Sequence, residues 1–329
     1  MKFYIQGYRG EGARAMMKDL RNIKDVVLWD EPLDRHIRES RLFRFCNTTR
    51  LGEGNRLLRS LWDGKYRCMN ESYDPREDKV FLFFSSGFHD AFSERLLKKL
   101  KAMENTELVL YIVDPMDSRF SVRLPHLLKY FDRVYSLDEE DCKTHGFTWY
   151  PLPYSKEELP EADRHVRLMY VGNSSTRDEM ILHLADYLRE RKIPYDFYIR
   201  SMEKNSRKDG LVFSDKRLKY GDNLKRIAGA DCILEVLHEG FGNATQRYTE
   251  AVCYDRRLLT TNLQASSLPF FNDRDVRIFG EEDLVGDELA DWLVSGEKAS
   301  YGYDGSFSPL RFIERITEDL NRDQERTSL

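Results

Sequence analysis

The polar run from Asp231 to Asn262 holds the side chains best suited to chemistry. It reads as a strand, a glycine-bearing loop, a helix at Thr245–Tyr254 and a second strand. Such a loop leaves backbone N–H groups free at a helix N-terminus, where the helix dipole favours an anion. The ionisable side chains around it are Glu235, His238, Glu239, Arg247 and Glu250. Because arginine binds phosphate through paired hydrogen bonds and carboxylates accept from sugar hydroxyls, the pattern favours a nucleotide-sugar site.

A second turn opens the same half of the chain. The strand Val166–Val171 runs into Gly172, which permits close backbone approach, and Ser174 to Thr176 can cap the helix that follows. The further donor-binding candidates from the two loops are Gly172, Asn173, Ser174, Arg177, Gly242, Asn243, Thr245 and Gln246. In a doubly wound sheet the two loops could converge. The alternative for the Gly172 turn is an ordinary helix cap. The alternative for residues 238–250 is a loop with solvated charges, with Arg247 and Glu250 paired as neighbours on one helix.

The first half offers candidates for a general base. His89 and Asp90 follow the apolar strand Lys79–Phe84, and Asp114 and Asp117 follow the next strand. Imidazole titrates near neutrality, so His89 beside Asp90 could deprotonate an acceptor hydroxyl. The alternative at both places is turn and capping chemistry, with Pro115 shaping the second turn.

Other motifs argue against cofactors and metals. Gly7-Tyr-Arg-Gly-Glu-Gly12 does not have the GxGxxG spacing of a dinucleotide site. Asp273-Arg-Asp275 lies in a loop rich in proline, asparagine and aspartate, and we interpret it as a turn rather than a metal site. The five cysteines show neither a CxxC pair nor zinc spacing. We therefore expect no cofactor, no bound metal, and free thiols in a reducing cytoplasm.

Composition narrows the range of partners. The chain has 329 residues, 52 basic against 57 acidic, for a net charge of −5. That balance argues against a general nucleic-acid binder, which would usually be basic. No secretory signal and no run of apolar residues long enough to span a bilayer are present. The basic helix Ser93–Met103 could rest on the inner membrane surface, although a packed helix with a solvated basic face is the commoner case.

Strand-like and helix-like segments alternate along the chain, which predicts an α/β fold with two layered halves. Strands are expected at Lys2–Gly7, Val26–Trp29, Lys79–Phe84, Glu107–Val113, Arg133–Leu137, Thr148–Leu152, Val166–Val171, Pro194–Arg200, Cys232–Val236, Arg257–Thr260 and Val276–Phe279. Helices are expected at Ala13–Arg21, Leu57–Trp62, Ser93–Met103, Val122–Phe131, Glu139–His145, Asp178–Arg191, Asn223–Ala228, Thr245–Tyr254, Glu282–Ser295 and Pro309–Asn321. A polar, proline-containing linker at 154–165 would separate a domain at 1–153 from one at 166–308, with 309–329 as a terminal helix and tail.

Several of these segments resemble the GT-B glycosyltransferases, and more narrowly the proteins of bacterial capsular polysaccharide and lipopolysaccharide synthesis. The similar segments lie within residues 79–280: Val171-Gly-Asn-Ser, Ile233-Leu-Glu-Val-Leu-His-Glu-Gly, Thr245-Gln-Arg-Tyr-Thr-Glu-Ala, Arg257-Leu-Leu-Thr-Thr-Asn, Tyr130–Asp141 and Tyr150–Tyr154. The resemblance implies two Rossmann-like domains facing a central cleft, with the final helix packing back on the first. It also implies that Glu250 and Arg247 hold the sugar, ribose and diphosphate, with Glu239 and His238 nearby. The spacing from Glu239 to Glu250 departs from the glutamate pair of many retaining members, so a retaining mechanism is not implied.

We therefore expect a metal-independent glycosyltransferase that uses a nucleotide-sugar donor, a UDP-sugar by preference, and a saccharide or lipid-linked acceptor. Two alternatives stay open at this point. One is a non-catalytic nucleotide-sugar-binding protein, which would need no base. The other is a sugar-nucleotide epimerase, which would need no acceptor.

Overall fold

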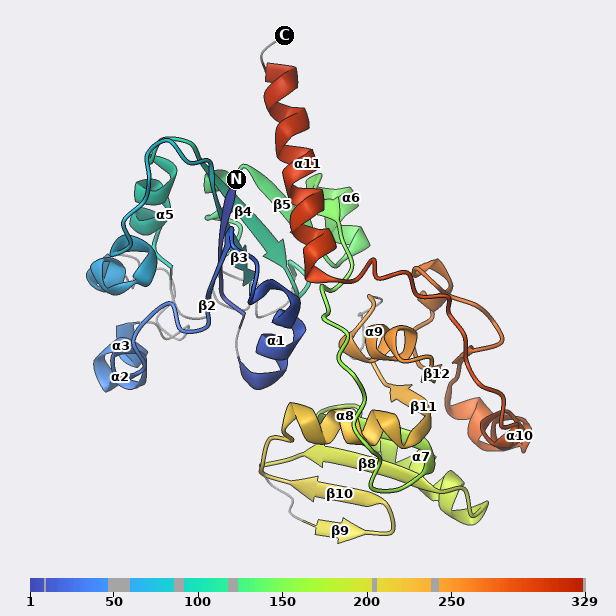
Figure 1. The fold of residues 1–329 in the computed structure, drawn as a ribbon. Helices are drawn as coiled ribbons and strands as arrows, with labels where there is room; N and C mark the ends of the chain where they lie inside the picture. Colours follow the sequence, from blue (N-terminus) through green and yellow to red (C-terminus); the bar gives the residue numbers. More distant parts are fainter. Residues whose placement is uncertain are drawn as a thin grey trace. The chain divides into compact units, whose positions relative to one another are not determined.

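A computed structural model describes residues 1–8, 10–46, 60–85, 92–117, 124–202, 206–237 and 243–327. The chain forms two compact units (Figure 1). One comprises Met1–Ser155 together with Ser308–Leu329, and the other comprises Lys156–Phe307. We call these the N-terminal unit and the C-terminal unit.

The N-terminal unit is built on a six-stranded parallel sheet in the order β2-β1-β3-β4-β5-β6. The strands are β1 (Lys2–Gln6), β2 (Val26–Trp29), β3 (Lys79–Phe84), β4 (Thr106–Ile112), β5 (Arg133–Ser136) and β6 (Thr148–Trp149). The helices are α1 (Gly10–Met16), α2 (Arg35–Glu39), α3 (Arg41–Cys46), α5 (Glu94–Lys101), α6 (Glu139–His145) and α11 (Pro309–Thr327). Every residue of β3 is buried, as expected of a central parallel strand covered on both faces.

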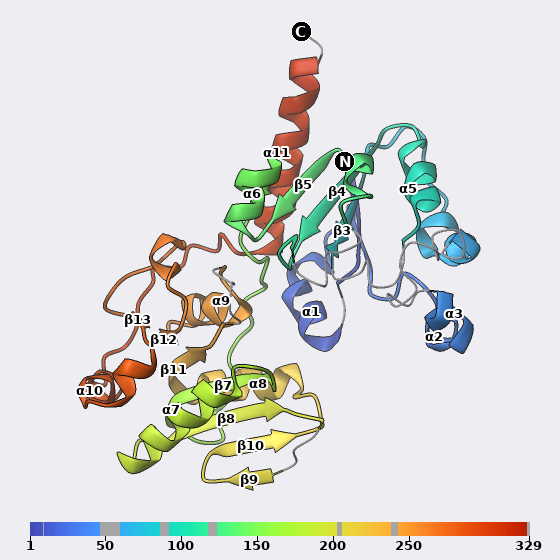
Figure 2. The ribbon, with the colours of Figure 1, turned by 180° about the vertical axis from the view of Figure 1, so that it is seen from behind.

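Helix α11 packs on the sheet of the N-terminal unit, far from it in sequence (Figures 1 and 2). The Phe312 ring lies 5.1 Å from that of Tyr111 and 5.2 Å from that of Tyr135. The Tyr135 hydroxyl donates to Asp319 Oδ2 at 2.9 Å. These contacts confirm that the final helix returns to the first domain.

The burial of α5 bears on the alternative that this basic helix rests on a membrane surface. Its leucines Leu96, Leu97 and Leu100 are fully buried, while Lys98 and Lys99 are exposed. The apolar face is therefore part of the core, and only the basic face is left for solvent. No helix in the described part of the chain is long and apolar enough to span a bilayer.

The C-terminal unit has a seven-stranded sheet in the order β13-β12-β11-β7-β8-β10-β9. Its strands are β7 (Val166–Asn173), β8 (Tyr195–Arg200), β9 (Ser206–Lys208), β10 (Leu211–Ser214), β11 (Ala230–Glu235), β12 (Arg257–Thr260) and β13 (Val276–Ile278). All neighbours are parallel except β9, which pairs antiparallel with β10. Its helices are α7 (Asp178–Glu190), α8 (Tyr220–Ala228), α9 (Gln246–Cys253) and α10 (Glu288–Val294).

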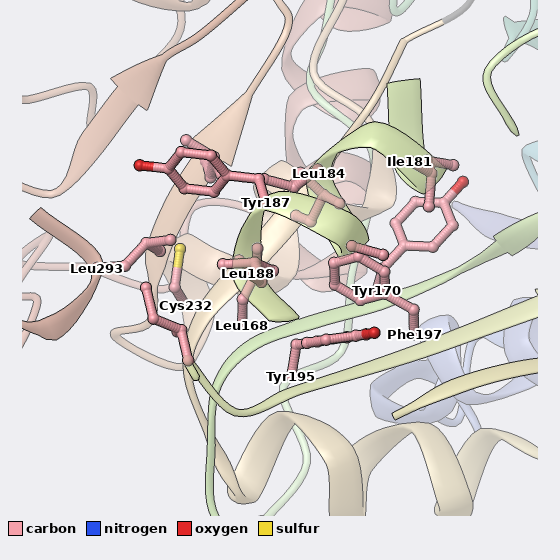
Figure 3. Close-up of a cluster of buried hydrophobic side chains, with 14 of the residues drawn as sticks. Leu168, Tyr170, Ile181, Leu184, Tyr187, Leu188, Tyr195, Phe197, Cys232 and Leu293 are labelled. Carbon is pink, nitrogen blue, oxygen red and sulfur yellow. The ribbon is translucent and has the colours of Figure 1, made fainter. Parts of the chain in front are cut away.

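Both faces of this second sheet are buried. Alternate strand residues such as Leu168, Tyr170 and Phe197 pack with α7 and α10 in one apolar cluster (Figure 3). The residues between them, such as Met169 and Ile233, are buried on the face where α8 and α9 contact the sheet. Two covered faces explain why these strands read as continuous apolar runs.

The predicted α/β fold with two Rossmann-like domains is confirmed, and every expected strand is present with slightly shifted ends, except that Thr148–Leu152 is reduced to the two residues of β6. Some helices were predicted too long. At 122–131 the described part holds only a short 3-10 turn, Leu128–Tyr130, because Pro125 cannot continue a helix. Residues 282–295 form a turn at Glu281–Leu284 and the separate helix α10, broken near Gly286. The hairpin β9–β10 was missed although Asp209-Gly210, both at positive φ, is a strong turn signal.

The carboxylates of Glu107 and Asp132 lie close together near α11. We expect them to make the free energy of unfolding depend on pH. Burial, with the hydrogen bond and negative charge of Asp132, raises the pKa of Glu107 to about 7. Lys101 lies near both carboxylates, and Gln324 of α11 also reaches Glu107. Between the usual glutamate pKa and 7, the folded protein holds a proton that the unfolded chain has released, so stability falls as the pH rises.

We expect Glu107→Gln, which mimics the protonated acid, to match the wild-type melting temperature at about pH 5 and to exceed it at about pH 8. Thermal unfolding across that range measures the difference. Glu104→Gln, at an exposed position nearby, is the control. A difference between Glu107→Gln and wild type that stays constant with pH would contradict the assignment.

Candidate functional site

The strand ends from which the two predicted loops start lie together at the carboxyl edge of the sheet in the C-terminal unit. Strands β7 and β11 are parallel neighbours, so their ends meet at the same edge. The Arg247 Nε donates to the Val171 carbonyl oxygen at 3.1 Å, and the Arg177 Nη1 donates to the Val236 carbonyl oxygen at 2.9 Å. Arg247, in the first turn of α9, therefore reaches β7, and Arg177, just before α7, reaches the residue after β11.

The side chain of Glu235 is buried at this edge of the sheet and does not face solvent. It ends β11 and is 1% exposed. Its Oε1 accepts from the backbone N–H and hydroxyl of Thr245, and its Oε2 accepts from the Thr260 hydroxyl at 2.6 Å. Burial raises the pKa of Glu235, while these hydrogen bonds oppose the rise. Since both oxygens are engaged, the residue orients the loop and the helix start.

Thr245, predicted as a donor-binding residue, is the N-cap of α9. Its hydroxyl oxygen accepts a hydrogen bond from the Arg247 backbone N–H at 3.0 Å, and the same hydroxyl donates a hydrogen bond to Glu235. A threonine hydroxyl can do both at once, because it carries one donor and two lone pairs. Glu235 therefore fixes the cap, and the cap fixes the first turn of the helix that carries Arg247.

Glu250 is the most enclosed carboxylate of the site, with no exposed surface. Its Oε1 accepts from Asn223 Nδ2 at 2.9 Å and from Gln246 Nε2 at 2.8 Å, and its Oε2 pairs with Arg247 Nη1. The pairing of Arg247 and Glu250 along one helix is thus present, but it is buried rather than solvated. Asn223 of α8 was not singled out from the sequence, because its role depends on a contact between separate helices.

The turn after β7 differs in detail from the prediction. Ser174 to Thr176 were expected to cap α7, but Arg177 occupies the position before its first residue and makes no side-chain cap. The carboxylate of Asp178 instead binds the Ser174 hydroxyl and the Ser175 N–H at 3.0 Å. An acidic residue in the first turn takes the place of a cap because it satisfies free N–H groups and the helix dipole together.

The hydrogen bonds of the Arg177 guanidinium all go to neutral oxygen atoms among the described residues. Its guanidinium donates to the Ser175 hydroxyl at 3.0 Å and to the carbonyls of Asn173 at 3.3 Å and Val236 at 2.9 Å. Asn173 is exposed beside it, and Asn243 is half-buried just before the α9 cap. These contacts fix the guanidinium in place without cancelling its charge.

Other predicted site residues lie elsewhere. His238, Glu239, Gly242, His89 and Asp90 fall outside the residues that the structure describes. Asp114 is half-buried just after β4 in the N-terminal unit, and Asp117 is exposed.

Asp275 is a structural residue. It is fully buried and accepts from Arg274 Nη2 at 2.8 Å and from the Ser300 N–H at 2.9 Å. Burial acts to raise the pKa of its carboxyl, but these hydrogen bonds together hold it below its usual value. Within the described ranges, no three histidine, cysteine, aspartate or glutamate side chains come together as a metal site would require.

Comparison with known proteins defines the fold. No family model matches the sequence, and no curated protein matches it either. Solved structures do match over nearly the whole chain. An α,α-trehalose-phosphate synthase (UDP-forming) from Burkholderia vietnamiensis has a TM-score of 0.57 at 10% identity, covering 100% of this chain and 99% of that one.

Two further matches agree. An α-glucosyltransferase in complex with UDP and DNA has a TM-score of 0.55 at 12% identity, with 96% and 98% of the two chains covered. A trehalose-6-phosphate synthase has a TM-score of 0.51 at 11% identity, with 99% and 90% covered. The chain therefore has the GT-B fold, two Rossmann-like domains in succession.

The Thr245 cap generates a stability prediction. Thr245→Val removes the hydroxyl that caps α9 and leaves buried Glu235 without one donor, so we expect a loss of about 2–4 kcal/mol. Thr245→Ser should restore most of it. Denaturant unfolding of the three proteins measures the effect.

Thr249→Val is the matched control for that experiment. Thr249 is buried on the same helix, but its hydroxyl bonds only the Thr245 carbonyl at 3.3 Å. An equal loss in Thr245→Val and Thr249→Val would show that the cap has no special role.

Proposed function

We propose that this protein is a glycosyltransferase that moves a sugar from a nucleotide-sugar donor to a saccharide or lipid-linked saccharide acceptor. One observation carries the proposal: Arg177 and Arg247 are fixed at the carboxyl edge of a parallel sheet, beside the N-terminus of α9. Parallel sheets bind nucleotides at this edge, and fixed guanidinium groups suit a diphosphate. The GT-B structures that the chain is similar to include enzymes whose names record UDP.

The donor would bind to the C-terminal unit, within residues 166–308. Arg177, Arg247, the Gly172–Ser174 turn and the loop before Thr245 would stabilise the leaving diphosphate as negative charge develops on it. Fixed cations can do this work without a metal ion, and we propose a metal-independent reaction. A UDP-sugar is the proposed donor.

The acceptor would bind to the N-terminal unit, within residues 1–153. A base there, His89 or Asp90 before Asp114, would remove the proton from the acceptor hydroxyl if the reaction inverts. A saccharide suits this chain better than DNA, since the net charge is −5. Surface polysaccharide synthesis in the cytoplasm, with peripheral contact at the inner membrane, is the setting that the sequence resemblance favours.

The first test is binding. We expect UDP to raise the melting temperature equally with Mg²⁺ and with EDTA, because only a bound ligand stabilises the folded state. Arg177→Ala should weaken UDP binding about tenfold or more. Arg189→Ala is the matched control, because Arg189 lies near the other end of α7, which Arg177 precedes, and pairs with Asp186 at the exposed surface. No thermal shift with any nucleotide of a panel would refute the donor site.

The second test separates catalysis from binding alone. Donor turnover with an acceptor mixture should fall sharply in His89→Ala or in Asp114→Asn, with UDP affinity unchanged. A non-catalytic binding protein would show no turnover in the wild type. An epimerase would convert the donor with no acceptor present.

A further inference from the structure

Tyr170 carries a buried hydroxyl that the core does not satisfy. The residue lies on β7 and is 2% exposed, and its ring packs 6.1 Å from that of Phe197 within the apolar cluster (Figure 3). Among the residues that the structure describes, its hydroxyl has no hydrogen-bond partner. Buried hydroxyls nearly always have partners, because an unpaired one loses its hydration without compensation. An exception at the edge of a proposed binding site therefore indicates a partner that arrives with a ligand.

The position of the Tyr170 hydroxyl indicates which chemical group of a bound ligand it would contact. A Cβ added at Gly172 would lie 2.1 Å from the Tyr170 hydroxyl oxygen, so the hydroxyl is directly against the Gly172 backbone. Gly172 lies at the end of β7, just before the turn that leads to Ser174 and Arg177. Burial raises the pKa of Tyr170, while the positive charges of Arg177 and Arg247 both act to lower it. The hydroxyl therefore lies close enough to both guanidinium groups for their positive charges to affect its pKa.

We propose that the Tyr170 hydroxyl donates a hydrogen bond to a phosphate oxygen of the donor's diphosphate, held between Arg177 and Arg247. This inference rests on the proposed function and adds a ligand-binding residue to it. A phosphate that bridges the two guanidinium groups supplies the acceptor that the hydroxyl lacks. The absence of a side chain at Gly172 lets the hydroxyl and the phosphate approach the same point, with a small shift of the turn.

The alternative is that the hydroxyl is merely tolerated in the core. Tyr195 provides the comparison, because its ring belongs to the same cluster (Figure 3) while its hydroxyl lies beside the Arg189 guanidinium, away from the carboxyl edge. Tyr195 pairs with Leu168 at the start of the strands, whereas Tyr170 pairs with Phe197 nearer their carboxyl ends. Both side chains are buried on the same face of the sheet. Comparing them therefore separates the effect of position along the strand from the effect of burial.

The test is isothermal titration of UDP and of pyrophosphate into wild type, Tyr170→Phe and Tyr195→Phe. Phenylalanine keeps the ring, so Tyr170→Phe should fold with an unchanged or higher melting temperature. We expect its Kd for both ligands to rise about tenfold, the loss of one hydrogen bond to a charged group. Tyr195→Phe should bind both ligands as wild type does.

Each outcome decides between the claims. If wild type binds UDP and Tyr170→Phe binds it equally tightly, the inference is wrong and the proposed function stands. If both variants lose affinity together, the effect belongs to the core and the inference is wrong again. If wild type binds neither UDP nor pyrophosphate, the proposed function fails and this inference with it.

Discussion

The buried carboxylate of Glu250 is the constraint on which the candidate site depends. An ion without exposed surface is tolerated only when its oxygens are well bonded, and here the donors come from Asn223, Gln246 and Arg247. Arg247 in turn donates to the carbonyl of Val171. One buried charge thus ties α8, α9 and the end of β7 together. The geometry of the edge follows from satisfying that charge.

Glu235 acts by the same logic one strand away. Its oxygens are saturated by Thr245 and Thr260, so the helix start and the neighbouring strand are both held by it. The contrast with Tyr170 is instructive, because the acidic groups of the edge are fully bonded while this neutral hydroxyl is not. A site with rigid supports and an unpaired buried hydroxyl can donate a hydrogen bond to a ligand.

The sequence predicted the strands well because two covered faces require continuous apolar runs, as in Lys79–Phe84. It placed Arg247 and Glu250 correctly on one helix, since their spacing makes them neighbours there. It could not predict that Glu235 and Glu250 point inward, because a position beside a loop does not fix the direction of a side chain. Asn223 and Tyr170 were missed for a related reason: their polar groups look ordinary until tertiary structure brings them to the edge. The hairpin at Asp209-Gly210 could have been predicted from the sequence, because this dipeptide is a local turn signal.

The charges of the site suggest different roles for its two arginines. Arg247 is paired with the buried carboxylate of Glu250, so much of its charge is offset within the protein. The hydrogen bonds of the Arg177 guanidinium go to neutral oxygens, which do not offset its charge. An approaching diphosphate would therefore meet the field of Arg177 and the N-terminus of α9 first. Arg247 would contribute mainly by fixed geometry, since its hydrogen bonds to β7 and Glu250 hold it still. We infer that Arg177, rather than the better-buried Arg247, supplies most of the electrostatic attraction for the donor.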